Sequence, residues 1–281
     1  MRLALLLLLA APAPPGVNTS FDVPYAEPKN ERQLLDIYAP AGARQAPVVL
    51  WVHGGGWMAG HKRLVDQKPA AFTAKGYVFV SINYRFIPHV KMEDIVRDVA
   101  RATGWVHRHI GEYGGNRERL FLMGHSAGAQ LVALLATDHR YLAAEKVPLR
   151  HIRGCVPVDG DTYDVPLQVA TAVARRKAEH LPPPKWGHPE KFGDLAHQRD
   201  LSAVTHIAPH RPIPPFLILH VASHPDTSAQ AWRLWSALDR AGYRATLFAA
   251  ENSDHMKLDR DLGVPADPAT EALFAFAGKY H

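Results

Sequence analysis

Short apolar runs separated by amphipathic stretches are the main pattern of this chain. The runs are apolar at consecutive positions rather than at alternate ones, which is typical of strands buried on both faces of a parallel sheet. They occur at 34–38, 47–52, 77–82, 120–123, 152–158, 215–221 and 245–249.

Helical segments lie between these runs and predict an alternating α/β fold. Residues 91–110 carry an apolar stripe at helical spacing, with Ile95, Val99 and Val106 on one face. Further helices are predicted at 65–75, 129–136, 227–241 and 268–280. Alternating strands and helices favour a mostly parallel sheet covered on both faces, within one domain from residue 20 to residue 281.

Two stretches depart from this alternation. Residues 14–33 are polar and proline-rich, and we expect an extended lead-in there. Residues 159–214 contain Pro182-Pro183-Pro184 and several His and Gly residues, and they predict at most two short helices. We interpret 159–214 as a small lid insertion over the edge of the sheet where the chemistry is expected.

A glycine–serine motif lies directly after the run at 120–123. Residues 124–128 read Gly-His-Ser-Ala-Gly, and a helix-forming segment follows. Strand, sharp turn and helix in this order are the setting in which Gly-x-Ser-x-Gly forms a nucleophile elbow. A strained turn projects the serine hydroxyl into open space, and only small residues fit at its flanks. Ser126 is therefore the predicted nucleophile.

A serine nucleophile needs a base that takes its proton and an acid that orients the base. In folds with this elbow, the acid and then the histidine follow the serine along the chain. Asp226 follows the strand at 215–221, and His255 follows the last strand. Ligands bind at the carboxyl ends of parallel strands, so we expect Ser126, Asp226 and His255 to meet there.

The identity of the acid has alternatives. Asp226 stands just before Thr227-Ser228, where it could simply cap the following helix. Asp159 and Asp161 follow the strand at 152–158 and could supply the carboxylate instead.

The segment His53-Gly54-Gly55-Gly56 follows the run at 47–52. Attack on a carbonyl creates an oxyanion, and each preformed N–H donor stabilises it by about 3–4 kcal/mol. Glycines let consecutive amides turn inward without a side chain in the way. We expect the amides of Gly55, Gly56 and Ala127 to form the oxyanion hole.

Two neighbours of these groups are candidates for substrate binding. Trp57 follows the glycines, and His125 precedes Ser126. A glycine-rich loop can also bind phosphate, but no Lys-Ser or Lys-Thr pair follows this one, which argues against a nucleotide site.

Composition and charge limit the other possibilities. The chain has 281 residues, of which 47% are hydrophobic and 21% charged, as expected for one large globular domain. Its formal charge is +5, and the only compact basic run is Arg175-Arg176-Lys177, which predicts a solvated helix face. Without a basic stripe interleaved with aromatic residues, nucleic acid is not an expected partner.

Cysteine and histidine usage gives no sign of a cofactor. The single cysteine, Cys155, lies in an apolar strand and is expected to be a small buried residue. The pairs His107/His109 and His206/His210 lack the accompanying ligand pattern of a metal site. We therefore expect neither metal nor cofactor.

The N-terminal segment resembles an export signal. Arg2 precedes an apolar run at 3–11, and Ala11-Pro12-Ala13 has the form of a cleavage site. The run is too short to span a bilayer. We expect residues 1–19 to hold the signal and lead-in, with the mature protein beginning between Ala13 and Ser20. The protein would then be periplasmic or secreted, without membrane attachment, or cytoplasmic if the signal is not used.

These motifs together resemble the α/β-hydrolase superfamily, in particular its hormone-sensitive-lipase-like esterases marked by His-Gly-Gly-Gly. Residues 83–85, 124–129 and 221–226 are similar to bacterial carboxylesterases and feruloyl-esterase-like proteins, a group that borders the arylformamidases. The resemblance covers nearly the whole chain after about residue 20. The loop at 220–226 is longer than the family's common His-Gly-x-x-Asp pattern.

The resemblance implies an α/β-hydrolase fold with the triad Ser126, Asp226 and His255 and with oxyanion glycines at Gly55 and Gly56. It implies a serine carboxylesterase that hydrolyses small short-acyl or aryl esters through an acyl-enzyme, without a cofactor. An arylformamidase acting on N-formyl amides is one alternative. A catalytically silent binding protein is another, disfavoured because the serine, the histidine and the glycine loop are all present. The sequence does not indicate an oligomeric state.

Overall fold

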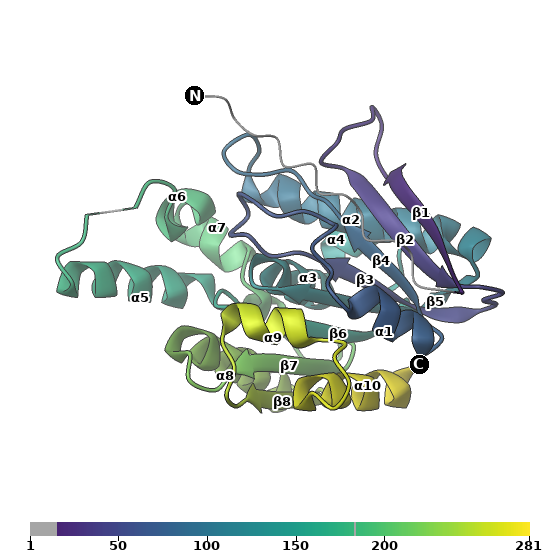
Figure 1. Cartoon of the computed structure of the whole chain (residues 1–281). Helices are drawn as coiled ribbons and strands as arrows, with labels where there is room; N and C mark the ends of the chain where they lie inside the picture. Colours follow the sequence, from purple (N-terminus) through teal and green to yellow (C-terminus); the bar gives the residue numbers. More distant parts are fainter. Residues whose placement is uncertain (1–15, 183) are drawn as a thin grey trace, which may run out of the picture.

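A single eight-stranded sheet forms the centre of the molecule (Figure 1). The computed structural model describes residues 16–182 and 184–281. The strands are β1 (Val17–Pro24), β2 (Leu34–Pro40), β3 (Ala46–Val52), β4 (Val78–Ile82), β5 (Gly115–His125), β6 (Ile152–Val158), β7 (Phe216–Val221) and β8 (Ala245–Ala250). Their order in the sheet is β1-β2-β4-β3-β5-β6-β7-β8.

The sheet is parallel from β4 to β8 and antiparallel at one edge. β2 pairs antiparallel with both β1 and β4, and all other neighbouring pairs are parallel. The carboxyl ends of β3, β5, β6, β7 and β8 therefore lie at the same edge. The predicted mostly parallel α/β sheet is confirmed. Strand β1, which pairs with β2 from Val17, occupies part of the stretch where we expected only an extended lead-in.

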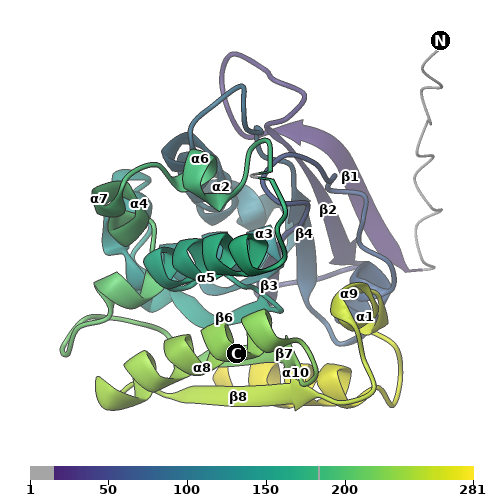
Figure 2. The ribbon, with the colours of Figure 1, turned by 90° about the vertical axis from the view of Figure 1, so that its left-hand side faces the viewer.

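Helices cover both faces of the sheet (Figures 1 and 2). One face packs against α2 (Met92–His109), α3 (Ala127–Thr137) and α8 (Pro225–Arg240), and the other against α1 (Lys68–Ala74), α9 (His255–Asp261) and α10 (Pro268–Tyr280). A short helix, α4 (His139–Ala144), follows α3. The fold is that of an α/β-hydrolase.

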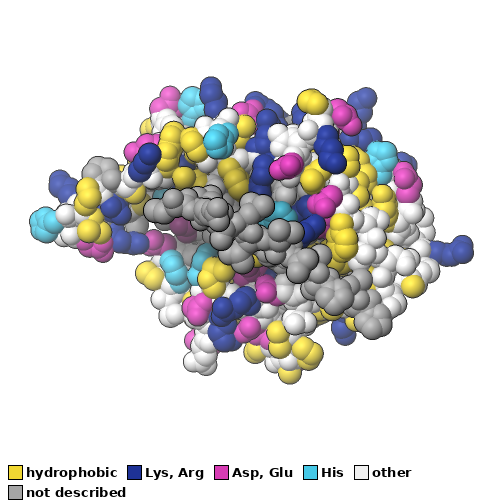
Figure 3. Space-filling model, turned by 45° about the horizontal axis from the view of Figure 1, so that its top comes forward, with side chains coloured by type: hydrophobic (Ala, Val, Ile, Leu, Met, Phe, Trp, Pro, Cys, Tyr) yellow, Lys and Arg dark blue, Asp and Glu magenta, His cyan; other side chains and the backbone are white. Residues whose placement is uncertain are grey.

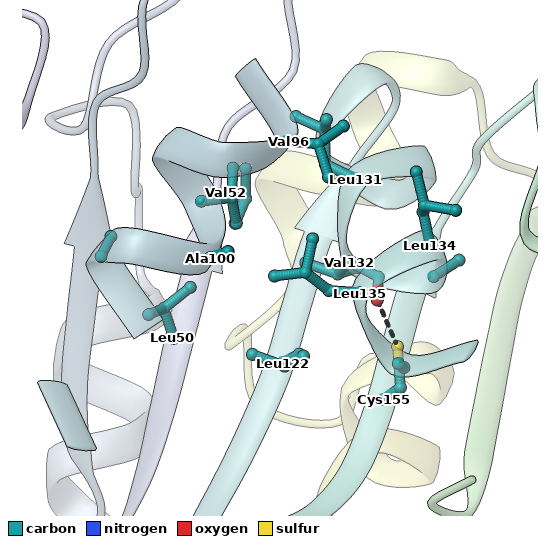
Figure 4. Packing of buried hydrophobic residues seen from close by; sticks show 14 of the residues in the cluster. Leu50, Val52, Val96, Ala100, Leu122, Leu131, Val132, Leu134, Leu135 and Cys155 are labelled. Atoms are coloured by element: carbon teal, nitrogen blue, oxygen red, sulfur yellow. Dashed lines mark hydrogen bonds between the residues drawn. The ribbon is translucent and has the colours of Figure 1, made fainter. Parts of the chain in front are cut away.

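The continuous apolar strands are buried on both faces, as their sequences predict. In β3, Leu50 and Val52 belong to the core under α2 and α3, whereas Val49 and Trp51 belong to the core on the opposite face. Figure 4 shows Leu131 and Leu135 of α3 in the first core, with Leu131 near Val96 of α2.

Cys155 lies in the same core, as expected. Its thiol donates to the carbonyl of Val132 over 3.5 Å (Figure 4), and burial raises the pKa of the thiol well above its ordinary value.

The insertion at 159–214 contains more helix than predicted. It forms α5 (Val165–Ala178), α6 (His188–Phe192), α7 (Leu195–Asp200) and a 3-10 turn (Ala203–His206). The expectation of at most two short helices is wrong because α5 buries few side chains, among them Val165 and Gln168, and so lacks a clear apolar stripe. The Asp164 side chain caps its start by accepting from the amide of Leu167.

Charged side chains are mixed on the surface. Figure 3 shows basic, acidic and histidine side chains interspersed, with no large area of one sign on the face in view. Among the described residues, no helix combines the length and apolar character needed to cross a bilayer.

A truncation in the core beneath the elbow helix should destabilise the fold. We expect Leu131→Ala, at a fully buried position, to lower the free energy of unfolding by about 2–5 kcal/mol because it leaves a cavity. Leu195→Ala, at a residue that is 51% exposed on α7, should change it by less than about 0.5 kcal/mol. Urea denaturation of both variants measures the difference, and equal losses would contradict this account of the core.

Candidate active site

The turn between β5 and α3 depends on two glycines that flank Ser126. A Cβ on Gly124 would lie 2.5 Å from the carbonyl oxygen of Gly128, and a Cβ on Gly128 would lie 2.1 Å from that of Val52. Contacts this short exclude any side chain at either position. The motif Gly-x-Ser-x-Gly therefore reflects how closely the start of α3 approaches β5 and β3.

Ser126 itself has a strained backbone. Its φ of 53° and ψ of −116° are unusual for a residue with a side chain, and its amide donates to the carbonyl of Val158 over 2.9 Å. Ala127, the next residue, begins α3. Within the described part of the chain, the Ser126 hydroxyl has no hydrogen-bond partner. It is thus available to react, as the predicted nucleophile elbow requires.

The glycine loop after β3 lies against the elbow. A Cβ on Gly54 would be 3.1 Å from the Cβ of Ser126. Gly55 and Gly56 have φ values of 110° and 60°, in the region that favours glycine. The amides of Gly55, Gly56 and Ala127 have no acceptor among the residues that the structure describes. These three amides belong to the loop and the helix that adjoin Ser126, and their role as the oxyanion hole stays a prediction.

Buried aromatic contacts hold this loop in place. His53 stacks on Tyr84 with a centroid separation of 4.4 Å, and the Tyr84 hydroxyl donates to the carbonyl of His53 over 3.0 Å. Burial lowers the pKa of His53 to about 3, so the imidazole is neutral. The amides of Met58 and Ala59 both donate to the carbonyl of Gly55, which closes the turn.

His255 pairs with Asp159 rather than with Asp226. Nδ1 of His255 lies 2.6 Å from Oδ2 of Asp159, and the amide of Val221 donates to the other carboxylate oxygen over 2.9 Å. Burial acts to raise the pKa of Asp159, but hydrogen bonds from His255, Val221 and Thr227 outweigh it and leave the pKa lowered. The same hydrogen bond raises the pKa of His255, against the effect of its burial.

The prediction that Asp226 orients the histidine is therefore wrong. Asp226 lies in the first turn of α8 and forms an ion pair with Arg175 of α5, with Nη1 of Arg175 2.7 Å from Oδ2. This pairing lowers the pKa of Asp226. Asp159, the alternative at the end of β6, occupies the position instead. The unusual length of the loop at 220–226 was the sequence signal that could have favoured it.

A buried network fixes α9, which begins at His255, to the elbow. Nε2 of His125 lies 2.9 Å from the carbonyl oxygen of His255, and the two rings are 4.4 Å apart. Nδ1 of His125 lies 3.5 Å from the Asp259 carboxylate, which pairs with the fully buried Lys68 at 2.7 Å. Burial lowers the pKa of His125 to about 4, although Asp259 acts in the opposite direction. Both ring nitrogens of this candidate substrate contact thus face α9.

Trp57, the other candidate substrate contact, joins the loop to the insertion. Its indole N–H donates to Gln130 of α3 over 3.2 Å. Its ring meets the edges of Phe192 at 5.1 Å and His188 at 6.1 Å, both on α6. The insertion therefore packs directly over the glycine loop, as its interpretation as a lid requires.

This geometry suits nucleophilic attack on a carbonyl. The site combines a half-buried serine whose hydroxyl has no hydrogen-bond partner among the described residues, an imidazole held by a carboxylate, and amides without an acceptor. These are the parts of a Ser-His-Asp site. In the residues described, no cluster of three or more His, Cys, Asp or Glu side chains could hold a metal ion.

Comparison with known proteins agrees with the fold and places the chain in a family. The chain belongs to the BD-FAE family, whose model matches residues 35–231. An inhibited esterase B from Lactobacillus rhamnosis superposes with a TM-score of 0.74 at 20% identity, covering 95% of this chain and 89% of the other. That likeness concerns the fold.

Two curated relatives extend over nearly the whole chain. Esterase LipQ of Mycobacterium tuberculosis (strain ATCC 25618 / H37Rv) is 29% identical over 96% of this chain, which spans 66% of LipQ, just under two thirds of its length. The kynurenine formamidase of Danio rerio is 26% identical over 93% of this chain and 83% of its own length.

The His255–Asp159 pair should be visible in a titration. The pKa of His255 is raised above its ordinary 6.5, so the pair stabilises the fold below pH 6.5, and the stabilisation is lost as pH rises through the raised pKa. Asp159→Asn should lower the pKa of His255 by about one unit or more, since it removes the paired charge. Asp226→Asn should leave it unchanged.

The measurement is a proton NMR titration of the imidazole signals, with the His255 signal assigned by its absence in His255→Gln. A shift in Asp226→Asn with none in Asp159→Asn would reverse the assignment of the acid.

Proposed function

We propose that the protein is a serine carboxylesterase that hydrolyses short-acyl or aryl esters. The observation that carries this proposal is the His255–Asp159 hydrogen bond, together with the contact of His255 to His125, which directly precedes the strained, unpartnered Ser126. Similarity to Esterase LipQ and membership of the BD-FAE family support it.

The proposed reaction gives these residues the roles of a Ser-His-Asp site. Nε2 of His255 takes the proton of Ser126 as its Oγ attacks the ester carbonyl, and Asp159 holds the opposite ring nitrogen and stabilises the imidazolium. The amides of Gly55, Gly56 and Ala127 bind the oxyanion. His255 then protonates the leaving alcohol, and water activated by His255 hydrolyses the acyl-enzyme.

The preference for short chains rests on the form of the lid. Helices α6 and α7 have 5 and 6 residues, and Phe192 packs on Trp57 directly above the glycine loop. Because the lid packs this closely on the glycine loop, a short acyl or aryl group fits beneath it more easily than a long acyl chain does.

A formamidase is the second candidate. The similarity to the kynurenine formamidase covers 93% of this chain. It spans 83% of that protein's length, against 66% of the length of LipQ. The same nucleophile and amides could attack the carbonyl of an N-formyl aryl amide. Only the leaving group would differ.

Hydrolysis of a 4-nitrophenyl ester series from acetate to palmitate tests the proposal. We expect the highest kcat/KM at the short chains and a loss of about 10³-fold or more in Ser126→Ala, because the nucleophile is removed. Undiminished turnover in Ser126→Ala would exclude Ser126 as the catalyst. Turnover of formanilide but of no ester would favour the formamidase, and no turnover of either would favour the silent binding protein.

The same assay compares the two carboxylates. Asp159→Asn should reduce kcat by about 10²-fold or more, since the imidazole loses its orienting charge. Asp226→Asn serves as the matched control and should retain most activity.

We also propose that the protein is exported. The support is the sequence of the N-terminal segment, most of which lies outside the described residues. Because β1 is paired from Val17, we expect cleavage before that residue, within the predicted interval from Ala13 to Ser20. N-terminal sequencing of the full-length product from a fractionated bacterial host checks this, and an uncut chain retained in the cytoplasm would contradict it.

A further inference from the structure

Helix α6 of the lid presents two nitrogen-bearing side chains toward the glycine loop. His188 and Lys191 are three positions apart and so lie on the same side of the helix. Both approach Trp57: the His188 ring lies at 6.1 Å, and the Lys191 ammonium lies 5.3 Å from the ring centroid. Neither residue is used by the proposed reaction.

The Lys191 ammonium is an unneutralised charge beside the oxyanion loop. It lies 3.7 Å from the point where a Cβ on Gly56 would be. Within the described residues, it forms no ion pair or hydrogen bond, although Asp161 and Glu190 are close enough to influence it. Burial lowers the pKa of Lys191, and the charges of Asp161 and Glu190 act in the opposite direction.

The His188 imidazole adds a second unsatisfied group. Its Nε2 is buried without a hydrogen-bond partner, and the nearest carboxylate oxygen, on Asp161, is 3.8 Å away. Burial lowers the pKa of His188, so the ring is neutral and can donate from Nε2 to an acceptor. A buried polar atom without a partner is costly unless a ligand satisfies it.

We propose that Lys191 and His188 bind a carboxylate carried by the ester substrate. This inference rests on the proposed esterase function and narrows its substrate class to anionic esters. Lys191 and Phe192 line a cavity of about 640 Å³ on one side of α6, and His188 lines a second cavity of about 550 Å³ on the other side. The part of the substrate that bears the charge would lie in the first cavity, at Lys191, with His188 behind it. An ammonium and an N–H donor on one helical turn provide a charge-assisted site for two carboxylate oxygens.

Acidic side chains also lie near this site, because Glu93, Asp94 and Glu190 line the same cavity as Lys191. Asp161, the carboxylate nearest to His188, accepts from the hydroxyl of Thr162 and from the amide of Gln168 at 3.3 Å. The oxygen that accepts from Gln168 is Oδ2, the same oxygen that lies 3.8 Å from His188. Asp226 is neutralised by Arg175.

Two matched ester pairs test the proposal and locate the charge. Mono(4-nitrophenyl) glutarate against its methyl-capped diester tests a carboxylate on the acyl side, with the uncatalysed rate subtracted. 4-Acetoxybenzoate against its methyl ester tests the alcohol side. We expect the wild-type enzyme to favour the charged member of one pair by about ten-fold or more in kcat/KM, chiefly through KM.

For each variant, the measured quantity is the ratio of kcat/KM for the charged ester to kcat/KM for its neutral partner. Lys191→Met should bring the ratio of that pair close to one, Lys191→Arg should keep part of the preference, and His188→Phe should reduce it. Lys185→Met, at an exposed lysine of the same insertion, is the matched control and should keep the full ratio.

A wild-type enzyme that hydrolyses neutral esters without preferring either charged member would overturn the proposal and leave the esterase function standing. A preference that survives Lys191→Met, or is lost equally in Lys185→Met, would also overturn it. If the wild-type enzyme hydrolyses none of the four esters, the esterase function and this inference both fail.

Discussion

The close approach of α3 to β3 and β5 is the constraint on which the site depends. Glycine at 124 and 128 lets the backbone atoms of these segments approach so closely that a Cβ at either position would clash. The turn between them then forces Ser126 to a positive φ, and a helix begins immediately after it. Because the same contact brings the glycine loop against the serine, one packing arrangement positions both the proposed nucleophile and the proposed oxyanion donors.

Most of the sheet could be predicted because its strands are buried on both faces. Continuous apolar runs such as the one in β3 leave little ambiguity about burial, and the elbow motif carries its own geometric requirement. Strand β1 was missed because it is an edge strand with few buried side chains, so its sequence lacks that signal. The length of α5 was underestimated for a similar reason, because this helix packs into the lid rather than onto the core.

The sequence did not identify the carboxylate that pairs with His255, and the reason is different. Asp159 and Asp226 both follow strands at the carboxyl edge, so chain order alone does not choose between them. Arg175, which neutralises Asp226, comes from α5, whose position no local pattern predicts. Asp159 has a positive φ of 48° directly after β6, and that turn directs its carboxylate to His255. Contacts between distant segments, rather than local propensity, decide which carboxylate serves the histidine.

The buried pair of Lys68 and Asp259 joins segments that are 191 residues apart. Helix α9 carries the histidine, and it can dock on the elbow only when this pair and the contacts of His125 can form. During synthesis, Ser126 and the glycine loop are therefore made long before His255, the proposed base. Contacts of such large separation are entropically expensive to form early, so the site is completed late in folding. Under the proposed function, hydrolytic capacity would therefore appear only after α9 has docked on the elbow.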